Sequence, residues 1–154
     1  MRDLKTCDIV LVSVNSPALL GIYQNNKLIC EFKESGKSSD ILPKIFNEVI
    51  KNYKIENIFY ANGPGNFSAI KLTHIFLQTL NIVNGISLFC ADSFTFSDDK
   101  FINAYGKIHF FKENGEIKST RLKERLEAKF KLPKEINKSL FHQNCTPLYI
   151  LPAV

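Results

Sequence analysis

The sequence predicts an α/β domain in which helices pack against a mixed β-sheet. Residues 8–14, DIVLVSV, form a nearly continuous apolar run, which is typical of a strand covered on both faces. A hairpin-like segment follows, and two helix-like segments then alternate with two apolar strands. Residues 1–91 therefore read β-β-β-α-β-α-β. A meander followed by such alternation is characteristic of a mixed sheet with helices against it.

The hairpin is predicted just after the first strand. Asn15-Ser16-Pro17 is a turn signal, and the segments 18–24, ALLGIYQ, and 27–33, KLICEFK, have the composition of strands. Asn25-Asn26 joins them, and asparagine tolerates the positive φ that a tight hairpin turn needs.

A first helix is predicted from about residue 40 to residue 53. Ser38 or Ser39 can cap its start, and Asp40 suits the positive end of the helix dipole. Pro43 fits in the first turn, where its missing N–H costs little. Two adjacent apolar rows give this helix a broad packing face: Ile41, Leu42, Ile45, Phe46, Val49 and Ile50.

A strand at 56–63, ENIFYANG, leads through Gly63-Pro64-Gly65 into a second helix at about 66–83. Gly85 is its expected C-terminal cap, and ISLFCA at 86–91 predicts the next strand.

Beyond residue 92 the patterns are weaker. Residues 107–122 predict a hairpin, because Asn114-Gly115 is a strong turn pair. Residues 120–130, TRLKERLEAKF, suggest a short charged helix, and 145–154, CTPLYILPAV, suggest a final short strand.

The Gly-Pro-Gly turn has two interpretations. Backbone N–H groups where a strand leads into a helix form a natural anion site. The turn matches neither common phosphate-binding pattern, however, and the proline removes one donor. The sequence favours the other interpretation, a sharp corner with unusual glycine dihedrals and an asparagine cap. The candidate anion-binding residues are Gly63, Pro64, Gly65, Asn66, Phe67 and Ser68.

The second helix is more apolar than one core face requires. Its polar side chains Lys71, His74, Gln78 and Asn81 cluster in a narrow stripe, and apolar residues occupy roughly 240° of the circumference. A helix lying on one sheet needs an apolar arc of only about 100° or somewhat more. We therefore expect a partner to cover the remainder, with the first helix beside it, and two such helix pairs would form a four-helix bundle.

The composition is typical of a globular protein, which we expect in the cytoplasm with its cysteines reduced. The 154 residues are 45% hydrophobic and 23% charged, and no apolar run resembles a signal peptide or reaches the length of a membrane span. The cysteines at 7, 30, 90 and 145 form no C-x-x-C pair and have no histidine at ligand spacing. They are interpreted as buried thiols, and no metal site is predicted.

No group of residues in the sequence has the pattern of a known catalytic site, so no reaction is predicted. His74 is expected at a surface or interface, and His109 and His142 have no partner in a recognisable motif. Asp98-Asp99 is interpreted as a solvated acidic pair. The net charge is +5, and residues 107–138 hold ten Lys or Arg and five Glu, which permits an RNA partner without requiring one.

At this point the ordered motifs resemble a known family. NGPGNFSAIKL resembles the G-P-G-S-F-T-G-x-R motif of the TsaB family, also called YeaZ, whose members help to make threonylcarbamoyladenosine on transfer RNA. Ser38-Ser39 followed by ILPKI is similar to the family's H-[ST]-x-x-L-L-P helix start, and PLYIL is similar to its P-x-Y-L end. The similarity is good over residues 8–105 and poor beyond them.

The resemblance implies an actin-like fold with ribonuclease-H-like lobes. Residues 1–105 would be the N-terminal lobe that carries the partner-binding helices, and 106–154 a shortened C-terminal lobe. The protein would be a non-catalytic scaffold that pairs with the larger TsaD transferase subunit through two helices. A TsaE-like ATPase would join the complex, transfer RNA would be contacted indirectly, and the isolated chain would form a homodimer. The candidate interface residues are Ile45, Phe46, Val49, Ile70, His74 and Leu77.

The chain also departs from the family. Asn15 stands where an acidic residue is common, and a neutral amide binds a divalent metal more weakly than a carboxylate. The resemblance thus implies no cofactor for the chain itself, with ATP or ADP and magnesium entering at the level of the complex. Two alternatives stay open: a small nucleotide-binding phosphotransferase that uses the Gly-Pro-Gly turn, and a self-associating adaptor that pairs through the same helices.

Overall fold

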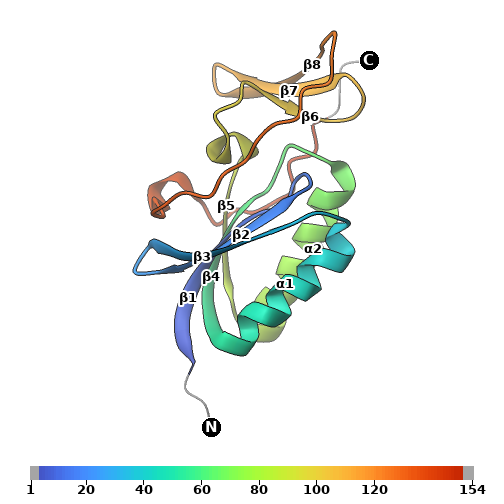
Figure 1. The fold of residues 1–154 in the computed structure, drawn as a ribbon. Helices are drawn as coiled ribbons and strands as arrows, with labels where there is room; N and C mark the ends of the chain where they lie inside the picture. The colour runs from blue at the N-terminus through green and yellow to red at the C-terminus, as the bar shows by residue number, and fades with distance from the viewer. Residues whose placement is uncertain (1–3, 151–154) are drawn as a thin grey trace.

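The computed structural model describes residues 4–150 and contains two sheets, of five and three strands, with two long helices (Figure 1). The larger sheet has the order β3-β2-β1-β4-β5, and the smaller has the order β6-β7-β8. The bounds are β1 Lys5–Val12, β2 Ala18–Gln24, β3 Lys27–Glu34, α1 Ser38–Asn52, β4 Tyr53–Ala61, α2 Phe67–Asn84, β5 Ser87–Ala91, β6 Phe101–Asn103, β7 Ile108–Glu113 and β8 Glu116–Arg121. Short 3-10 helices lie at η1 Ser93–Phe96 and η2 Lys138–Leu140.

The predicted α/β class and mixed sheet are confirmed. β1 lies at the centre, pairs antiparallel with β2 and parallel with β4, and β4 in turn pairs parallel with β5. Residues Ile9 to Val12 are at most 1% exposed, as the continuous apolar run predicts for a strand covered on both faces.

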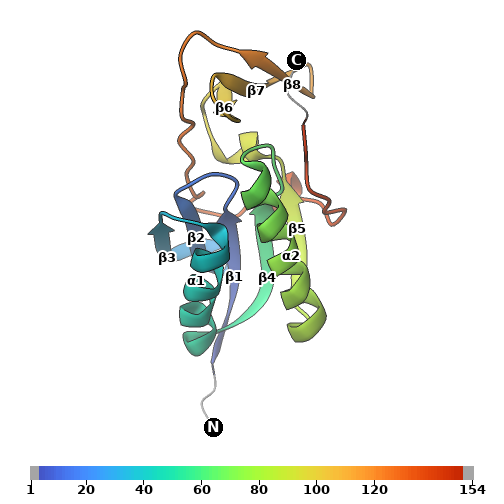
Figure 2. The ribbon, with the colours of Figure 1, turned by 90° about the vertical axis from the view of Figure 1, so that its right-hand side faces the viewer.

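The two faces of the large sheet are covered differently. Both helices lie on one face, side by side, and Figure 2 views them in front of the sheet. On the other face, the segment that follows β8 runs back across the strands with only the short η2 helix and isolated β-bridges, and Phe130, Leu132, Ile136 and Phe141 pack there. Backbone hydrogen bonds fasten this segment to the β2–β3 hairpin, including Ile136 N–H to the Asn26 carbonyl at 2.8 Å. The sheet is therefore a central layer between helices and an extended strap.

Turn and cap chemistry is largely as the sequence predicts. Asn25 and Asn26 have φ values of 52° and 65°, and Asn114-Gly115 turns the β7–β8 hairpin with positive φ at both residues. Gly85 ends α2 in the left-handed conformation.

The start of α1 differs from the prediction. The helix begins at Ser38, and Lys37 is the N-cap residue with no side-chain capping bond, so the predicted serine cap is wrong. Because the helix starts earlier, Pro43 lies inside it rather than in its first turn.

The last third of the chain contains less regular structure than predicted. Residues 122–130 form no helix, and 145–150 form no strand. The remainder of the predicted final strand, 151–154, lies outside the described residues. The division of the chain at residue 105 stays a prediction; β6 and β7, which pair with each other, lie on either side of that point.

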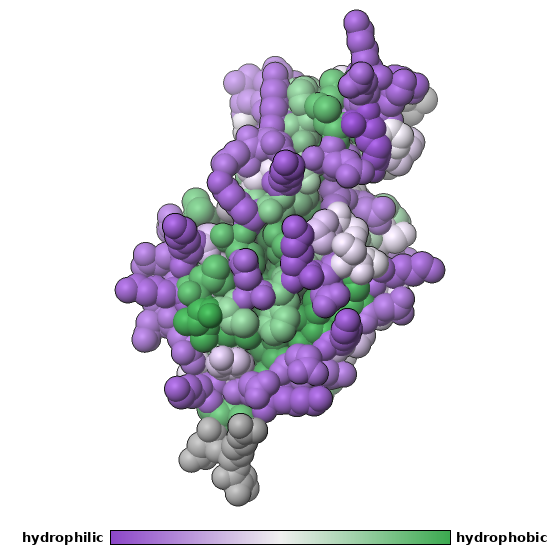
Figure 3. All heavy atoms as spheres, viewed as in Figure 1, coloured by the Kyte–Doolittle hydropathy of each residue, from purple (hydrophilic) through white to green (hydrophobic). Residues whose placement is uncertain are grey.

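Surface properties follow from this layering. Figure 3 shows apolar side chains gathered across the middle of one face, with polar side chains around them.

Cys7 and Cys90 are buried, but Cys30 is exposed because it lies on the edge strand β3, so its predicted burial is wrong. No helix among the described residues is long and apolar enough to cross a membrane.

Candidate functional site

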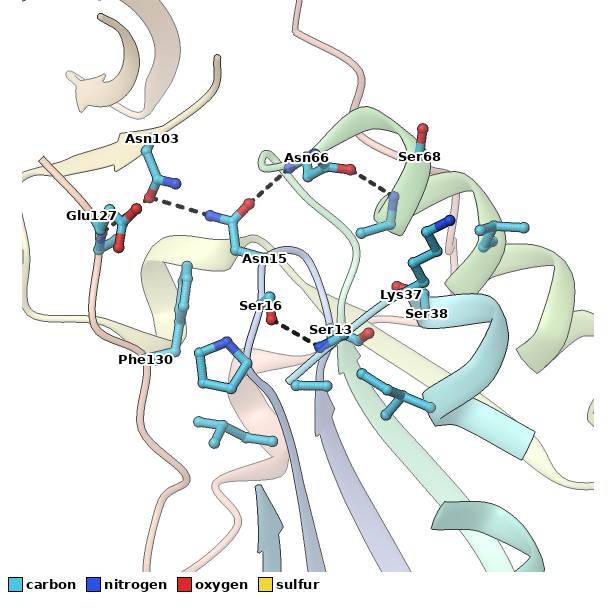
Figure 4. A pocket seen from close by; sticks show the side chains of 18 of the residues that line it. Ser13, Asn15, Ser16, Lys37, Ser38, Asn66, Ser68, Asn103, Glu127 and Phe130 are labelled. Carbon is cyan, nitrogen blue, oxygen red and sulfur yellow. Dashed lines mark hydrogen bonds between the residues drawn. The ribbon is translucent and has the colours of Figure 1, made fainter. Parts of the chain in front are cut away.

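A cavity of about 990 Å³ lies where the two sheets meet (Figure 4). The loop after β1 forms its floor, the first residues of α1 and α2 form one wall, and residues 103–104 and 125–130 form the other. Serine, asparagine and basic side chains dominate the lining, which includes Ser13, Asn15, Lys37, Ser38, Asn66 and Arg125.

Asn15 joins the two sides of this cavity. Its side-chain Oδ1 accepts a hydrogen bond from the backbone N–H of Asn66 at 3.0 Å, and its Nδ2 donates to Oδ1 of Asn103 at 3.3 Å. Asn103 Oδ1 also accepts from the backbone N–H of Ala128 at 3.0 Å. One amide therefore connects the start of α2 with β6 and the chain that follows β8, as the dashed lines in Figure 4 show.

The Gly-Pro-Gly turn is buried and tightly held. Ser93 donates its hydroxyl to the Pro64 carbonyl at 2.7 Å and its backbone N–H to the Gly63 carbonyl at 2.8 Å. Gly63 has φ of 126°, which only glycine adopts readily. Gly65 does not have positive φ; a Cβ there would lie 2.7 Å from the Val14 Cβ and carbonyl oxygen, so glycine is needed for a close backbone approach.

These contacts are those of a corner that sets the direction of α2. Asn66 caps the helix, as predicted, with Oδ1 accepting from the Ala69 N–H at 3.0 Å. The backbone N–H of Asn66 already donates to the Val14 carbonyl and to Oδ1 of Asn15, and residues 63–65 before it are buried. Phe67 and Ser68 are exposed at the helix start. Anion binding by this turn stays a prediction.

The charges in the cavity suit an anion better than a metal ion. The basic lining residues are Lys33, Lys37, Arg125 and Lys129, whereas Glu127 supplies the one carboxylate of the described lining and lies 3.7 Å from Arg125. Magnesium prefers several oxygen ligands, usually including carboxylates. Within residues 4–150, no three metal-binding side chains are placed to hold an ion.

The histidines His109 and His74 and the acidic pair Asp98-Asp99, for which no catalytic role was predicted, are mostly engaged in structural contacts. His109 is buried, with Nδ1 donating to the Lys107 carbonyl at 2.8 Å and Nε2 accepting from the Leu126 N–H at 2.9 Å. His74 is half-buried on α2, and burial lowers the pKa of its imidazole. Asp98 pairs with Lys131, and Asp99 accepts from the Lys129 N–H.

The candidate interface residues mostly face the chain's own sheet. Ile45, Phe46 and Val49 of α1, and Ile70 and Leu77 of α2, are all at most 4% exposed. They are therefore core residues in this chain, and their assignment to a partner surface is wrong for these side chains. The reason is that a helix apolar around most of its circumference offers several possible inward faces, and spacing alone does not select one.

The exposed apolar row of α2 lies on its other side. Ile75, Ile82 and Val83 are 52%, 80% and 74% exposed, and Leu72 is partly exposed beside them. Lys71 is the one charged residue in the helix sequence. We call these four side chains, Leu72, Ile75, Ile82 and Val83, the α2 outer row.

The helix pair is firmly assembled behind this row. The rings of Phe46 and Phe76 lie 5.2 Å apart between centroids and hold α1 against α2. Thr73 donates its hydroxyl to the Ser13 carbonyl at 3.3 Å, which fixes α2 to the end of β1. At the start of α2, Phe67 packs on Tyr149 with ring centroids 4.6 Å apart. The outer row thus lies on a helix that contacts α1, the end of β1 and the C-terminal segment.

Comparison with known proteins confirms the predicted fold. No family model and no curated protein sequence matches the chain. Among solved structures, the chain is similar to YeaZ from Pseudomonas aeruginosa, with a TM-score of 0.59 and 10% identity over 75% of this chain and 64% of that one. It is also similar to a protein described as uncharacterised with similarity to peptidase YeaZ from Pseudomonas aeruginosa, with a TM-score of 0.54, 11% identity, and coverage of 75% and 63%. The chain therefore has the actin-like fold of YeaZ and spans somewhat less than two thirds of those proteins.

Proposed function

We propose that the chain is a non-catalytic scaffold that docks a larger TsaD-like transferase subunit through the α2 outer row. The complex would form threonylcarbamoyladenosine on transfer RNA. The single observation that carries this proposal is the exposed apolar row on a helix with almost no charge. The likeness in fold to YeaZ supports the choice of partner.

Burying the side chains of the outer row in an interface would stabilise a complex. Fully burying an aliphatic side chain of this size is worth about 1.5–3 kcal/mol. Half or more of the surface of Ile75, Ile82 and Val83 is still accessible, so most of that gain remains available. Docking a matching apolar helix pair would bury these side chains in a four-helix bundle, within an interface of about 1,600 Å² or more.

α1 would form the second half of this platform. Ile50 is 39% exposed, and Asn47 and Pro43 lie exposed about one and two turns before it. The buried apolar rows of the same helix would support the platform from behind by filling the chain's own core.

The absence of catalysis by the chain itself is also part of the proposal. Asn15 stands at the cavity floor where a carboxylate would help to hold magnesium, and Glu127 is engaged by Arg125. ATP or ADP and magnesium, a TsaE-like ATPase and transfer RNA would then act at the level of the complex. When the transferase is absent, the outer row would pair two copies of the chain.

A second candidate function has one observation in its favour. The cavity at the start of both helices carries four basic side chains and suits a nucleotide's phosphates. A small nucleotide-dependent phosphotransferase would bind ATP and magnesium there with micromolar affinity and would turn over.

Two measurements test these alternatives. Size-exclusion chromatography of the chain, the large paralogue from the same cell, and their mixture should give a new, earlier peak that contains both proteins in equal amounts. Separate elution at concentrations of tens of micromolar would contradict the scaffold function. Isothermal titration of the chain alone with ATP and magnesium should give no heat of specific binding, and micromolar binding with turnover would favour the phosphotransferase instead.

A further inference from the structure

The chain's C-terminal segment brings a second cysteine to the edge of the large sheet. His142 pairs with Cys90 on β5 through two backbone hydrogen bonds, of 2.8 and 3.0 Å. The chain then turns, and the Cys145 thiol donates to the His142 carbonyl at 3.4 Å. The His142 carbonyl therefore accepts from both the Cys90 N–H and the Cys145 thiol, and Cys145 packs against the core cluster that contains Cys90, although 55 positions separate the two cysteines.

Two further groups surround this pair of thiols. The hydroxyl of Tyr60, on the neighbouring strand β4, is buried and has no hydrogen-bond partner of standard geometry within residues 4–150. Tyr60 and Cys90 belong to one buried cluster, and Cys145 packs against that cluster. On the other side, the imidazole Nδ1 of His142 lies 3.8 Å from the Cys90 sulfur.

The orphaned tyrosine hydroxyl points to the chemistry of the site. A buried donor without an acceptor is costly, whereas a thiolate is a strong acceptor. An anionic Cys145 sulfur would satisfy both Tyr60 and the Cys90 thiol. In agreement with this geometry, hydrogen bonding to Cys90 lowers the pKa of Cys145, while the same bond and burial raise the pKa of Cys90.

The two thiols also differ in access. Cys90 is fully buried. Cys145 is half-buried and lines a polar hollow of about 250 Å³ with Gln78, Asn81 and Gln143. A small polar oxidant such as hydrogen peroxide can therefore reach Cys145 and not Cys90.

We propose that Cys145 and Cys90 form a peroxide-sensitive pair that closes into an intrachain disulfide, with Cys145 as the attacking thiol and Cys90 as the resolving thiol. The bond would fasten the C-terminal segment to β5. This inference does not depend on the proposed scaffold function.

The chemistry balances with hydrogen peroxide as oxidant. The Cys145 thiolate attacks one peroxide oxygen, the O–O bond breaks, and Cys145 becomes a sulfenic acid. The leaving hydroxide takes the proton of the Cys90 thiol and departs as water. The Cys90 thiolate then attacks the Cys145 sulfur, and the second hydroxide leaves and is protonated by solvent. Two thiols are oxidised to one disulfide, and one peroxide is reduced to two waters.

The experiment treats the folded chain with a small excess of hydrogen peroxide, quenches it with an alkylating reagent, and measures intact mass and peptide maps. The expected product has lost two hydrogen atoms, is monomeric, and contains a peptide linked through positions 90 and 145. A Cys90→Ala variant should instead accumulate a sulfenic acid at position 145 that a dione probe traps. A Cys7→Ser, Cys30→Ser double variant should form the link at the rate of the native chain.

Three results would overturn the proposal. In the native chain, these are free thiols at both Cys90 and Cys145 after Cys30 has been oxidised, or a disulfide through Cys30 between two chains as the main product. In the folded Cys90→Ala variant, the contradicting result is the lack of a dione adduct at Cys145. If that variant fails to fold, Cys145→Ser provides the test, because it must abolish oxidation at position 90. Oxidation of Cys90 in the folded Cys145→Ser variant would contradict the assigned order of attack.

Discussion

The orientation of α2 can be tested by truncating two of its apolar side chains on opposite faces. Leu77 is fully buried in the core between the helices and the sheet, whereas Ile82 on the outer row is 80% exposed. Leu77→Ala removes buried methyl groups and leaves a cavity, which costs about 2–5 kcal/mol. Ile82→Ala loses little buried surface and gains helix propensity, so its effect should stay within about 0.5 kcal/mol of zero.

The measurement is the free energy of unfolding from urea titration, with thermal unfolding as a second probe. For a chain of this size, about 2–4 °C of melting temperature corresponds to 1 kcal/mol. Leu77→Ala should then melt roughly 4–20 °C below the native chain, and Ile82→Ala within about 2 °C of it. A larger loss for Ile82→Ala than for Leu77→Ala would mean that α2 is rotated about its axis and that the outer row is misassigned.

Three further predictions concern the turn and α2. Gly65→Ala should destabilise the chain by about 1–3 kcal/mol in urea unfolding, because the new Cβ would lie 2.7 Å from the Val14 carbonyl oxygen; an unchanged midpoint would contradict the close approach. Asn66→Ala should cost about 1 kcal/mol, because the Ala69 N–H loses its cap, and Asn66→Asp should retain most of the stability. The folded-state pKa of His74 is lowered by burial from its ordinary 6.5, so its neutral form contributes stability that is lost as the pH falls below 6.5. His74→Gln should therefore lose less unfolding free energy than the native chain between pH 7 and pH 5, and parallel pH profiles would refute this.

Much of the large sheet follows from local sequence patterns. The apolar run of β1, the asparagine turns and the Gly85 cap were all predictable, because each depends on residues adjacent in the chain. The Asn66 cap belongs to the same class. Local rules of this kind need no knowledge of distant contacts.

The packing face of α2 was not predictable from spacing. Buried Leu77 and exposed Ile75 are equally apolar neighbours on one helix, and only the position of the sheet distinguishes them. Where apolar residues cover most of a helix, the hydrophobic periodicity is shallow and no single direction is preferred.

The segment after β8 shows tertiary contacts overriding helix propensity. The backbone N–H groups of Leu126 and Ala128, which a helix would use internally, donate instead to His109 and Asn103. Helix propensity is a weak determinant of structure, and tertiary contacts of this kind outweigh it. The meeting of Cys90, Cys145 and His142 was likewise hidden, because it depends on a strap that returns to β5 from far along the chain.

The most direct test of the scaffold function compares two isoleucines that are about equally exposed. Ile75 on the outer row is 52% exposed, and Ile29 on the edge strand β3 is 47% exposed. Both substitutions, Ile75→Glu and Ile29→Glu, add the same charge at a solvent-accessible site, and circular dichroism should show that both variants stay folded. The dissociation constant for the TsaD-like subunit should rise about 100-fold or more for Ile75→Glu, because a charge would be buried at the centre of the interface, and less than about 3-fold for Ile29→Glu. Equal affinities for the two variants would contradict docking through α2.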